Sequence, residues 1–260
     1  MKLVVLSDAK AMDGYGSEHG LSFLIEVDHI RILFDTGASD LFIRNAEKIG
    51  IDLGDVDAIV LSHGHFDHGD GLQYVDGNTL VCHPGCFVKR YRKEGGVNLG
   101  LALTKKEIER KFKLKTSRDP LRLSEHLYFL GEIPRVNDFE AISTRYMLEG
   151  GEEDHVIDDS GLACITDKGL VVVSGCAHSG ICNIIEHAKK VTGMEQVEAV
   201  IGGFHLGAID RQTKKTIQYM NDHKIPGLFP SHCTRDPALK MFKEVLGSRE
   251  VVVGVERIWK

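Results

Sequence analysis

Ser62-His63-Gly64-His65-Phe66-Asp67-His68-Gly69 is the stretch that decides the fold of this chain. It holds three histidines and one aspartate within six residues, a density that ordinary structural histidines do not explain. The stretch follows an apolar run, residues 58–62, which predicts a short strand buried on both faces. Open α/β sheets place their sites in the loops beyond the carboxyl ends of such strands. The spacing therefore predicts a metal-binding loop.

The order of residue types within this loop suits two neighbouring metal ions. His63 and His65 stand two residues apart and can turn toward one ion, whereas the adjacent Asp67 and His68 can reach a second. Glycines at 64, 69 and 71 permit the tight path that this requires. Neutral imidazoles suit zinc, iron or manganese, and the carboxylate adds a harder ligand.

Later histidines also follow predicted strands. His178, His205 and His232 come just after the apolar runs 171–175, 199–201 and 227–230. We expect these residues to lie at the same edge of the fold as the first cluster and to be candidates for the remaining ligands. His19 precedes a predicted strand, and we expect it to have a structural or substrate-contacting role.

Short β-type runs alternate with helical patterns along the whole chain. Strands are predicted over 3–6, 22–27, 30–34, 58–62, 80–82, 162–166, 170–174, 197–201, 227–230 and 250–253. Helices are predicted over 40–49, 181–191, 213–221 and 237–246. This order indicates two β-sheets packed between helices.

Composition and charge exclude several classes of protein. The 260 residues, 42% of them hydrophobic, exclude a disordered segment and leave enough chain for a large core. A net charge of −6 disfavours nucleic acid as a partner. No apolar run is long enough for a secretory signal or a membrane span, so we expect a cytoplasmic protein with its six cysteines reduced.

One segment is basic in an otherwise acidic chain. Residues 85–125 carry a local charge of +7, which leaves −13 for the rest. One interpretation is a solvated helical excursion. The other is a basic lid, hinged at Gly95-Gly96, whose Lys and Arg side chains, Lys89 and Arg90 among them, attract and anchor an anionic substrate.

The HxHxDH pattern at 63–68 and the Ile32-Leu33-Phe34-Asp35-Thr36-Gly37 segment resemble the metallo-β-lactamase superfamily of hydrolases. The resemblance implies one domain over residues 1–260, folded as a four-layer αββα sandwich with two metal ions at one edge. It also implies that His63, His65 and a third histidine hold the first ion, that Asp67, His68 and His232 hold the second, and that Asp35 supports the metal loop.

The chain departs from the superfamily pattern at one ligand. An aspartate usually bridges the two metals, and the matching position resembles Cys176. His178 is the expected third ligand of the first site, with the Cys176 thiolate, Asp158 or Asp159 as alternatives. Cys176 can equally be a small buried apolar residue.

The implied activity is hydrolysis by a metal-bound hydroxide of a small anionic, phosphorylated substrate. Asp67 would orient the nucleophile, and His205 would donate to the developing negative charge or the leaving group. Zinc is the expected metal, with iron or manganese as alternatives. The segments around His178, His205 and His232 are similar to a branch of transferases that join a dihydropterin to ribofuranosylaminobenzene 5′-phosphate, which gives a second candidate function. A non-hydrolytic iron or redox metalloprotein is the third.

Overall fold

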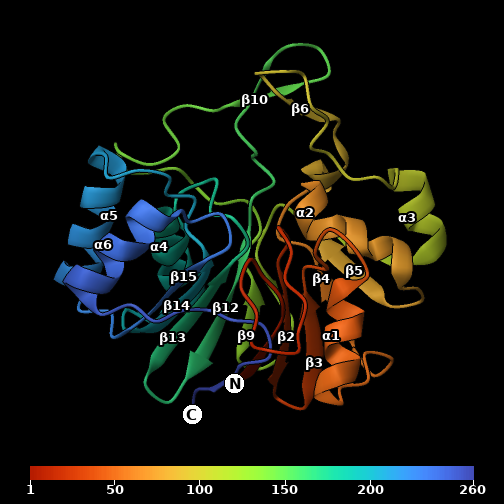
Figure 1. Cartoon of the computed structure of the whole chain (residues 1–260), viewed down its shortest axis with the longest axis horizontal. Coiled ribbons are helices and arrows are strands. Elements are labelled where there is room, and N and C mark those ends of the chain that lie inside the picture. Colours follow the sequence, from red (N-terminus) through yellow and green to blue (C-terminus); the bar gives the residue numbers. More distant parts are fainter.

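The computed structural model describes all 260 residues and shows two large β-sheets packed face to face, with helices on both outer sides. Figure 1 shows α1, α2 and α3 beside the first sheet and α4, α5 and α6 beside the second. This is the αββα sandwich expected from the sequence. None of the helices combines the length and the apolar character needed to cross a bilayer.

The first sheet has seven strands in the order β16-β1-β2-β3-β4-β5-β7. Its strands are β1 (Lys2–Ser7), β2 (Ser22–Val27), β3 (Ile30–Phe34), β4 (Ala58–Val60), β5 (Thr79–Cys82), β7 (Lys113–Thr116) and β16 (Glu256–Ile258). Its helices are α1 (Leu41–Ile49), α2 (Phe66–Gly69) and α3 (Lys105–Lys111), with 3-10 turns η1 (Asp70–Tyr74) and η2 (Pro84–Phe87). From β3 to β7 the strands run parallel, so their carboxyl ends share one edge.

The second sheet has six strands in the order β15-β14-β13-β12-β9-β8. Its strands are β8 (Leu121–Arg122), β9 (Leu127–Phe129), β12 (Gly161–Thr166), β13 (Gly169–Ser174), β14 (Val197–Gly203) and β15 (Gly227–Ser231). Its helices are α4 (Ile181–Thr192), α5 (Arg211–Asp222) and α6 (Asp236–Leu246). The strands β13, β14 and β15 are parallel and also end at a common edge.

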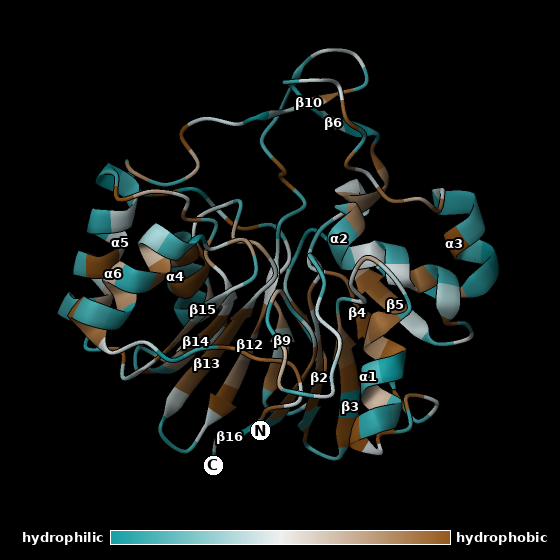
Figure 2. Cartoon of the chain, viewed as in Figure 1, coloured by the Kyte–Doolittle hydropathy of each residue, from teal (hydrophilic) through white to brown (hydrophobic).

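Three apolar cores hold the four layers together, and Figure 2 shows the brown, hydrophobic strands between partly teal helices. Phe23 and Phe34 of the first sheet meet Val173 of the second in the central core. Leu33 packs against α1 on one side, and Ile184 of α4 packs in the outer core of the second sheet. Burial of this kind is the main stabilising contribution to the fold.

A third, small sheet lies above the edge where the parallel strands end. It contains β6 (Arg90–Arg92), β10 (Tyr146–Leu148) and β11 (Glu153–Asp154), and Figure 1 shows β6 and β10 above the two main sheets. We call these three strands and the residues beside them, 89–98 around β6 and 145–154 around β10 and β11, the flap.

The basic segment 85–125 is not one helical excursion. Only Lys105–Lys111 is an α-helix, β7 is an edge strand of the first sheet, and β8 belongs to the second. The Gly95-Gly96 pair has positive φ angles of 78° and 60° and forms the tip of a hairpin closed by Arg92 and Val97. The basic residues of this segment therefore do not form one structural unit, because they lie in different parts of the fold.

The prediction of a strand over 250–253 is wrong. Val251 and Val253 are buried in the central core, but the segment makes only a single bridge, from Val253 to Ala11. The chain turns at Gly254, where φ is +90°, and the strand that pairs with β1 begins at Glu256. The apolar residues of this run are explained by burial in the core and not by pairing in a sheet.

Candidate metal centre

The histidine-rich loop leaves the carboxyl end of β4 and passes into the short helix α2. Gly64 permits its path, since a Cβ there would lie 1.9 Å from the Cys86 carbonyl oxygen. The buried Asp35, which follows β3, accepts from the backbone N and the Oγ of Ser62, both at 2.7 Å. The same carboxylate lies 2.7 Å from Nδ1 of His68, so it holds both ends of the loop.

His63, His65 and His178 form the first group of possible ligands. Nδ1 of His65 lies 2.9 Å from Nε2 of His63 and 3.1 Å from Nε2 of His178. Nitrogen ligands on a tetrahedral zinc ion are about 3.3 Å apart. The three nitrogens therefore have the spacing that one metal ion requires, and the third comes from the second sheet.

Asp67, His68 and His232 form the second group. Nε2 of His232 lies 3.0 Å from Nε2 of His68 and 3.3 Å from Oδ2 of Asp67, and the His68–Asp67 distance is 3.9 Å. The other ring nitrogen of His68 is occupied by Asp35. A carboxylate behind a ligating imidazole fixes the ring orientation in metal sites, so this group also fits a divalent ion.

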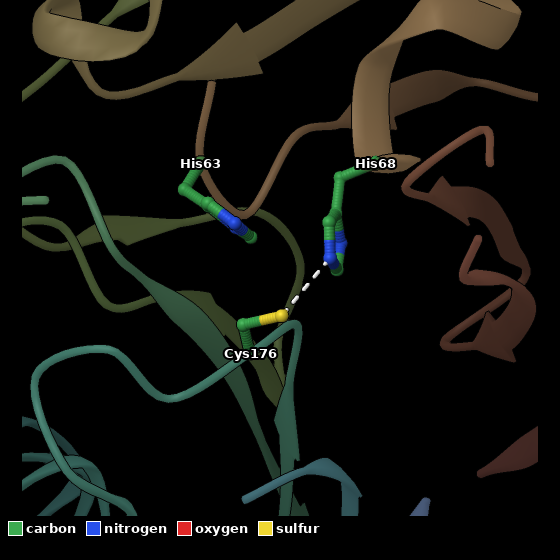
Figure 3. A group of neighbouring side chains, drawn as sticks. All are labelled: His63, His68 and Cys176. Atoms are coloured by element: carbon green, nitrogen blue, oxygen red, sulfur yellow. Dashed lines mark hydrogen bonds between the residues drawn. The ribbon is translucent and has the colours of Figure 1, made fainter. Parts of the chain in front are cut away.

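Cys176 points toward the space between His63 of the first group and His68 of the second, as Figure 3 shows. Its Sγ lies 3.1 Å from Nε2 of His68, and the residue also groups with His63. Cys176 is buried, and burial raises the pKa of its thiol. Cys176, His232 and Cys233 form a further cluster, and all six cysteines are free.

The ionisation of His63, His65 and Asp67 suits metal binding. Burial opposes the charged forms of His68 and His232, but Asp35 and Asp67, respectively, raise the pKa of these two rings. Burial, reinforced by the neighbouring histidines, lowers the pKa of His63 well below its usual range, and burial lowers the pKa of His65 to about 3. Burial opposes ionisation of Asp67, but the nearby His68 and His232 hold the pKa of its carboxyl below the usual value. Neutral imidazoles and an ionised carboxylate are the forms that bind metals.

The backbone around the centre is strained. Asp35, Ala177, His205 and His232 all have left-handed φ angles, of 56°, 52°, 50° and 52°. Such angles cost on the order of 1 kcal/mol each in non-glycine residues and cluster at functional sites. Each of these residues closely follows a strand, so the strain accompanies the turns that aim their side chains at one edge.

Besides Cys176, three sequence-predicted candidates lie outside both ligand groups. Asp158 accepts from the Gly64 N–H and pairs with Arg90, and Asp159 accepts from the N–H and hydroxyl of Ser179. Both carboxylates therefore brace the loops that carry the ligands. His205 lies beside the first group, with its ring centroid 4.4 Å from that of His178.

Two residues approach the centre more closely than the sequence indicated. Nε2 of His19 lies 3.2 Å from Oδ2 of Asp67, and its ring stacks on His232 at 5.0 Å. Tyr146 of the flap places its hydroxyl 3.1 Å from Nε2 of His205. The position of His19 before a strand was a weak signal, and Tyr146 carries no motif.

A cleft of about 1820 Å³ opens over the centre. Its walls include His65, Asp67, His178 and His232, and the flap contributes Tyr146. A small molecule in this cleft would reach both ligand groups. The arrangement can therefore hold metal ions against a bound substrate.

Comparisons with known proteins agree with this geometry. A model of the metallo-beta-lactamase superfamily matches residues 15–85. The chain is 38% identical over 252 residues to the 7,8-dihydropterin-6-methyl-4-(beta-D-ribofuranosyl)-aminobenzene-5′-phosphate synthase of Methanocaldococcus jannaschii, covering 88% of this chain and 85% of the relative. It is 32% identical over 249 residues to an uncharacterized protein of the same organism, covering 93% of each. Among solved structures it is similar to Tm1679, a metal-dependent hydrolase of the beta-lactamase superfamily, with a TM-score of 0.89, 29% identity and full coverage of both chains.

Proposed function

The chain belongs to the metallo-beta-lactamase superfamily. From this premise we propose that it is a hydrolase that acts on a small anionic substrate and uses two divalent metal ions, with zinc as the expected metal. Superfamily membership implies divalent metal binding and an enzyme built on this scaffold. The observation that carries the finer proposal is the pair of three-ligand groups, each with short distances between its ligand atoms and each with members on the wall of one cleft.

His63, His65 and His178 would hold the first ion, and Asp67, His68 and His232 the second. The chemistry supplied by two divalent ions bound there would be activation of water as a nucleophile at neutral pH and polarisation of the bond under attack. A hydrolysable ester, lactone or phosphodiester fits this chemistry.

The chain's own residues would position and exchange protons. Asp67 is ionised and reaches the second ligand group and His19 through one oxygen, Oδ2, so its other oxygen is suited to orient a water molecule. His205 lies beside His178 and is hydrogen bonded to Tyr146. It is placed to donate to the developing oxyanion or the leaving group.

A second candidate rests on the relative from M. jannaschii, whose name describes a synthase. In that case the same centre would serve a transferase that joins a dihydropterin to a phosphorylated ribofuranosyl arylamine. The identity of 38% over most of both chains favours this candidate. The two functions differ in whether water enters the product.

Reaction in ¹⁸O-labelled water distinguishes the two candidates. We expect a phosphodiester, lactone or ester substrate to yield a product with one labelled oxygen, activity to disappear after chelation, and zinc to restore it. A metal-dependent condensation product without label, formed from the pterin and arylamine substrates, would overturn the hydrolase proposal in favour of the transferase.

A further inference from the structure

The flap places a row of polar side chains over the first ligand group. Tyr146 of β10 pairs directly with Arg92 of β6 on one side and with Asp154 of β11 on the other. Residues directly opposite in antiparallel strands share a face of the sheet. Tyr146 and Arg92 both line the cleft, and so does Arg145, the residue before β10.

We propose that the flap carries an anion-binding subsite, formed by Arg92, Arg145 and the Tyr146–His205 pair, that holds a phosphoryl group of the substrate beside the first ligand group. The inference rests on the proposed function, because it names the substrate class and its place in the same cleft.

A buried ion-pair network fixes the flap against the metal-ligand loop. The Arg90 side chain is 1% exposed, and its Nη2 and Nε lie 2.6 Å from Asp158 and 3.2 Å from Asp154. The second oxygen of Asp158 accepts from the Gly64 N–H at 2.8 Å. Since residues two apart in a strand face the same side, Arg92 lies on the same face of β6 as Arg90, where it is exposed and lines the cleft.

Tyr146 lies at the inner end of the subsite. Its ring centroid is 5.0 Å from that of His65 and 5.4 Å from that of His178, and its hydroxyl is 3.1 Å from Nε2 of His205. Tyr146 and His205 both line the cleft, so this hydrogen-bonded pair presents polar atoms to a bound anion.

Arg92 and Arg145 have no carboxylate partner, unlike the other cations of the flap. Lys89 pairs with Glu149 at 2.6 Å, and Lys93 pairs with Glu153 at 2.5 Å. Arg90 is paired with the two buried aspartates described above. Lys89 and Arg90, expected from the sequence to bind the substrate, are both paired and do not line the cleft, whereas Arg92 of the same basic segment does line it. Two free guanidinium groups and one hydroxyl match a dianionic phosphoryl group, which accepts several hydrogen bonds at once.

Binding of orthophosphate to the metal-loaded protein tests this subsite without requiring turnover. We expect calorimetry to show that Arg92→Gln and Arg145→Gln each raise the Kd for orthophosphate about tenfold, since each removes a charge-assisted hydrogen bond. Tyr146→Phe should raise it by a smaller factor, and Arg92→Lys should recover part of the loss. Lys89→Gln is the matched control and should bind as the wild type does. Acetate should bind at least tenfold more weakly than orthophosphate in the wild type.

Metal content, measured on every variant, separates binding from structural damage. Unchanged orthophosphate affinity in both arginine variants, or a loss of affinity that merely follows a loss of metal, would overturn the subsite. Equal binding of acetate and orthophosphate would overturn its assignment to a phosphoryl group. Arginine-dependent binding in a protein that never incorporates labelled oxygen supports the subsite and rejects only the hydrolase proposal.

Discussion

Nδ1 of His65 lies 3.1 Å from Nε2 of His178, although 113 residues separate the two histidines. His65 follows β4 of the first sheet and His178 follows β13 of the second. The contact arises because the parallel strands of both sheets end at the same edge of the sandwich. The first ligand group therefore exists only when both sheets have packed together.

Removing the carboxylate behind His68 should weaken metal binding. Asp35→Asn replaces a charged acceptor 2.7 Å from Nδ1 of His68 and also alters the contacts to Ser62. We expect a decrease in metal affinity of about 10- to 100-fold, as for other carboxylates behind ligating histidines. Competition with a chromophoric chelator measures this decrease. Asp55→Asn, on the exposed surface, is the control, and an equal affinity in both variants would argue against the role of Asp35.

Breaking the buried network of the flap should destabilise the protein. Arg90→Met leaves Asp154 and Asp158 buried without their cation, a change that typically costs about 3–5 kcal/mol. Urea denaturation should show this decrease in the free energy of unfolding. Lys89→Met removes an exposed ion pair of the same flap and should change stability little. Similar unfolding curves for the two variants would mean that the network does not anchor the flap.

Acid should remove a contact between the two sheets. Asp28, in the β2–β3 turn, accepts from Ser124 and from the backbone and ring of His126. Burial opposes its ionisation, but the hydrogen bonds from His126 and Ser124 lower the pKa of Asp28 to about 2. Its unfolded pKa is about 3.9, so its contribution is complete above that value and is lost as the pH falls through 2.

The stability difference between the wild type and Asp28→Asn should therefore shrink between about pH 5 and pH 2. We expect a change of less than about 1 kcal/mol, because solvent screens this partly exposed pair. Chemical denaturation at several pH values provides the measurement. A difference that stays constant, or grows on acidification, would contradict the role of Asp28.

Cys176 should bias the centre toward soft metal ions. Its Sγ lies 3.1 Å from Nε2 of His68, within reach of an ion held by that ring. Because sulfur ligands favour zinc over manganese, Cys176→Ser should lower the ratio of zinc to manganese bound in competition. Cys164→Ser, a buried cysteine in the core between the sheets, should leave the ratio unchanged. An unchanged ratio in Cys176→Ser would show that the sulfur takes no part.

The sequence indicated the fold and most of the candidate ligands because both leave local signals. The 63–68 loop is contiguous, and His178 and His232 follow apolar runs that β13 and β15 confirm as strands. Tyr146 and Arg145 left no such signal, since the strands of the flap are two or three residues long and pair across distant segments. The charge of Arg90 was visible, but its burial between two aspartates depends on tertiary contacts that no local pattern reports.

Metal content tests the central claim most directly. Elemental mass spectrometry of protein purified without chelator or an affinity metal should find about two divalent ions per chain. His178→Ala and His232→Ala should each retain about one, because each removes a ligand from only one of the two proposed groups. His223 is a half-exposed residue at the carboxyl end of α5, and the control variant His223→Ala should retain both ions. A wild-type protein that holds no metal and takes up none on reconstitution would contradict the account.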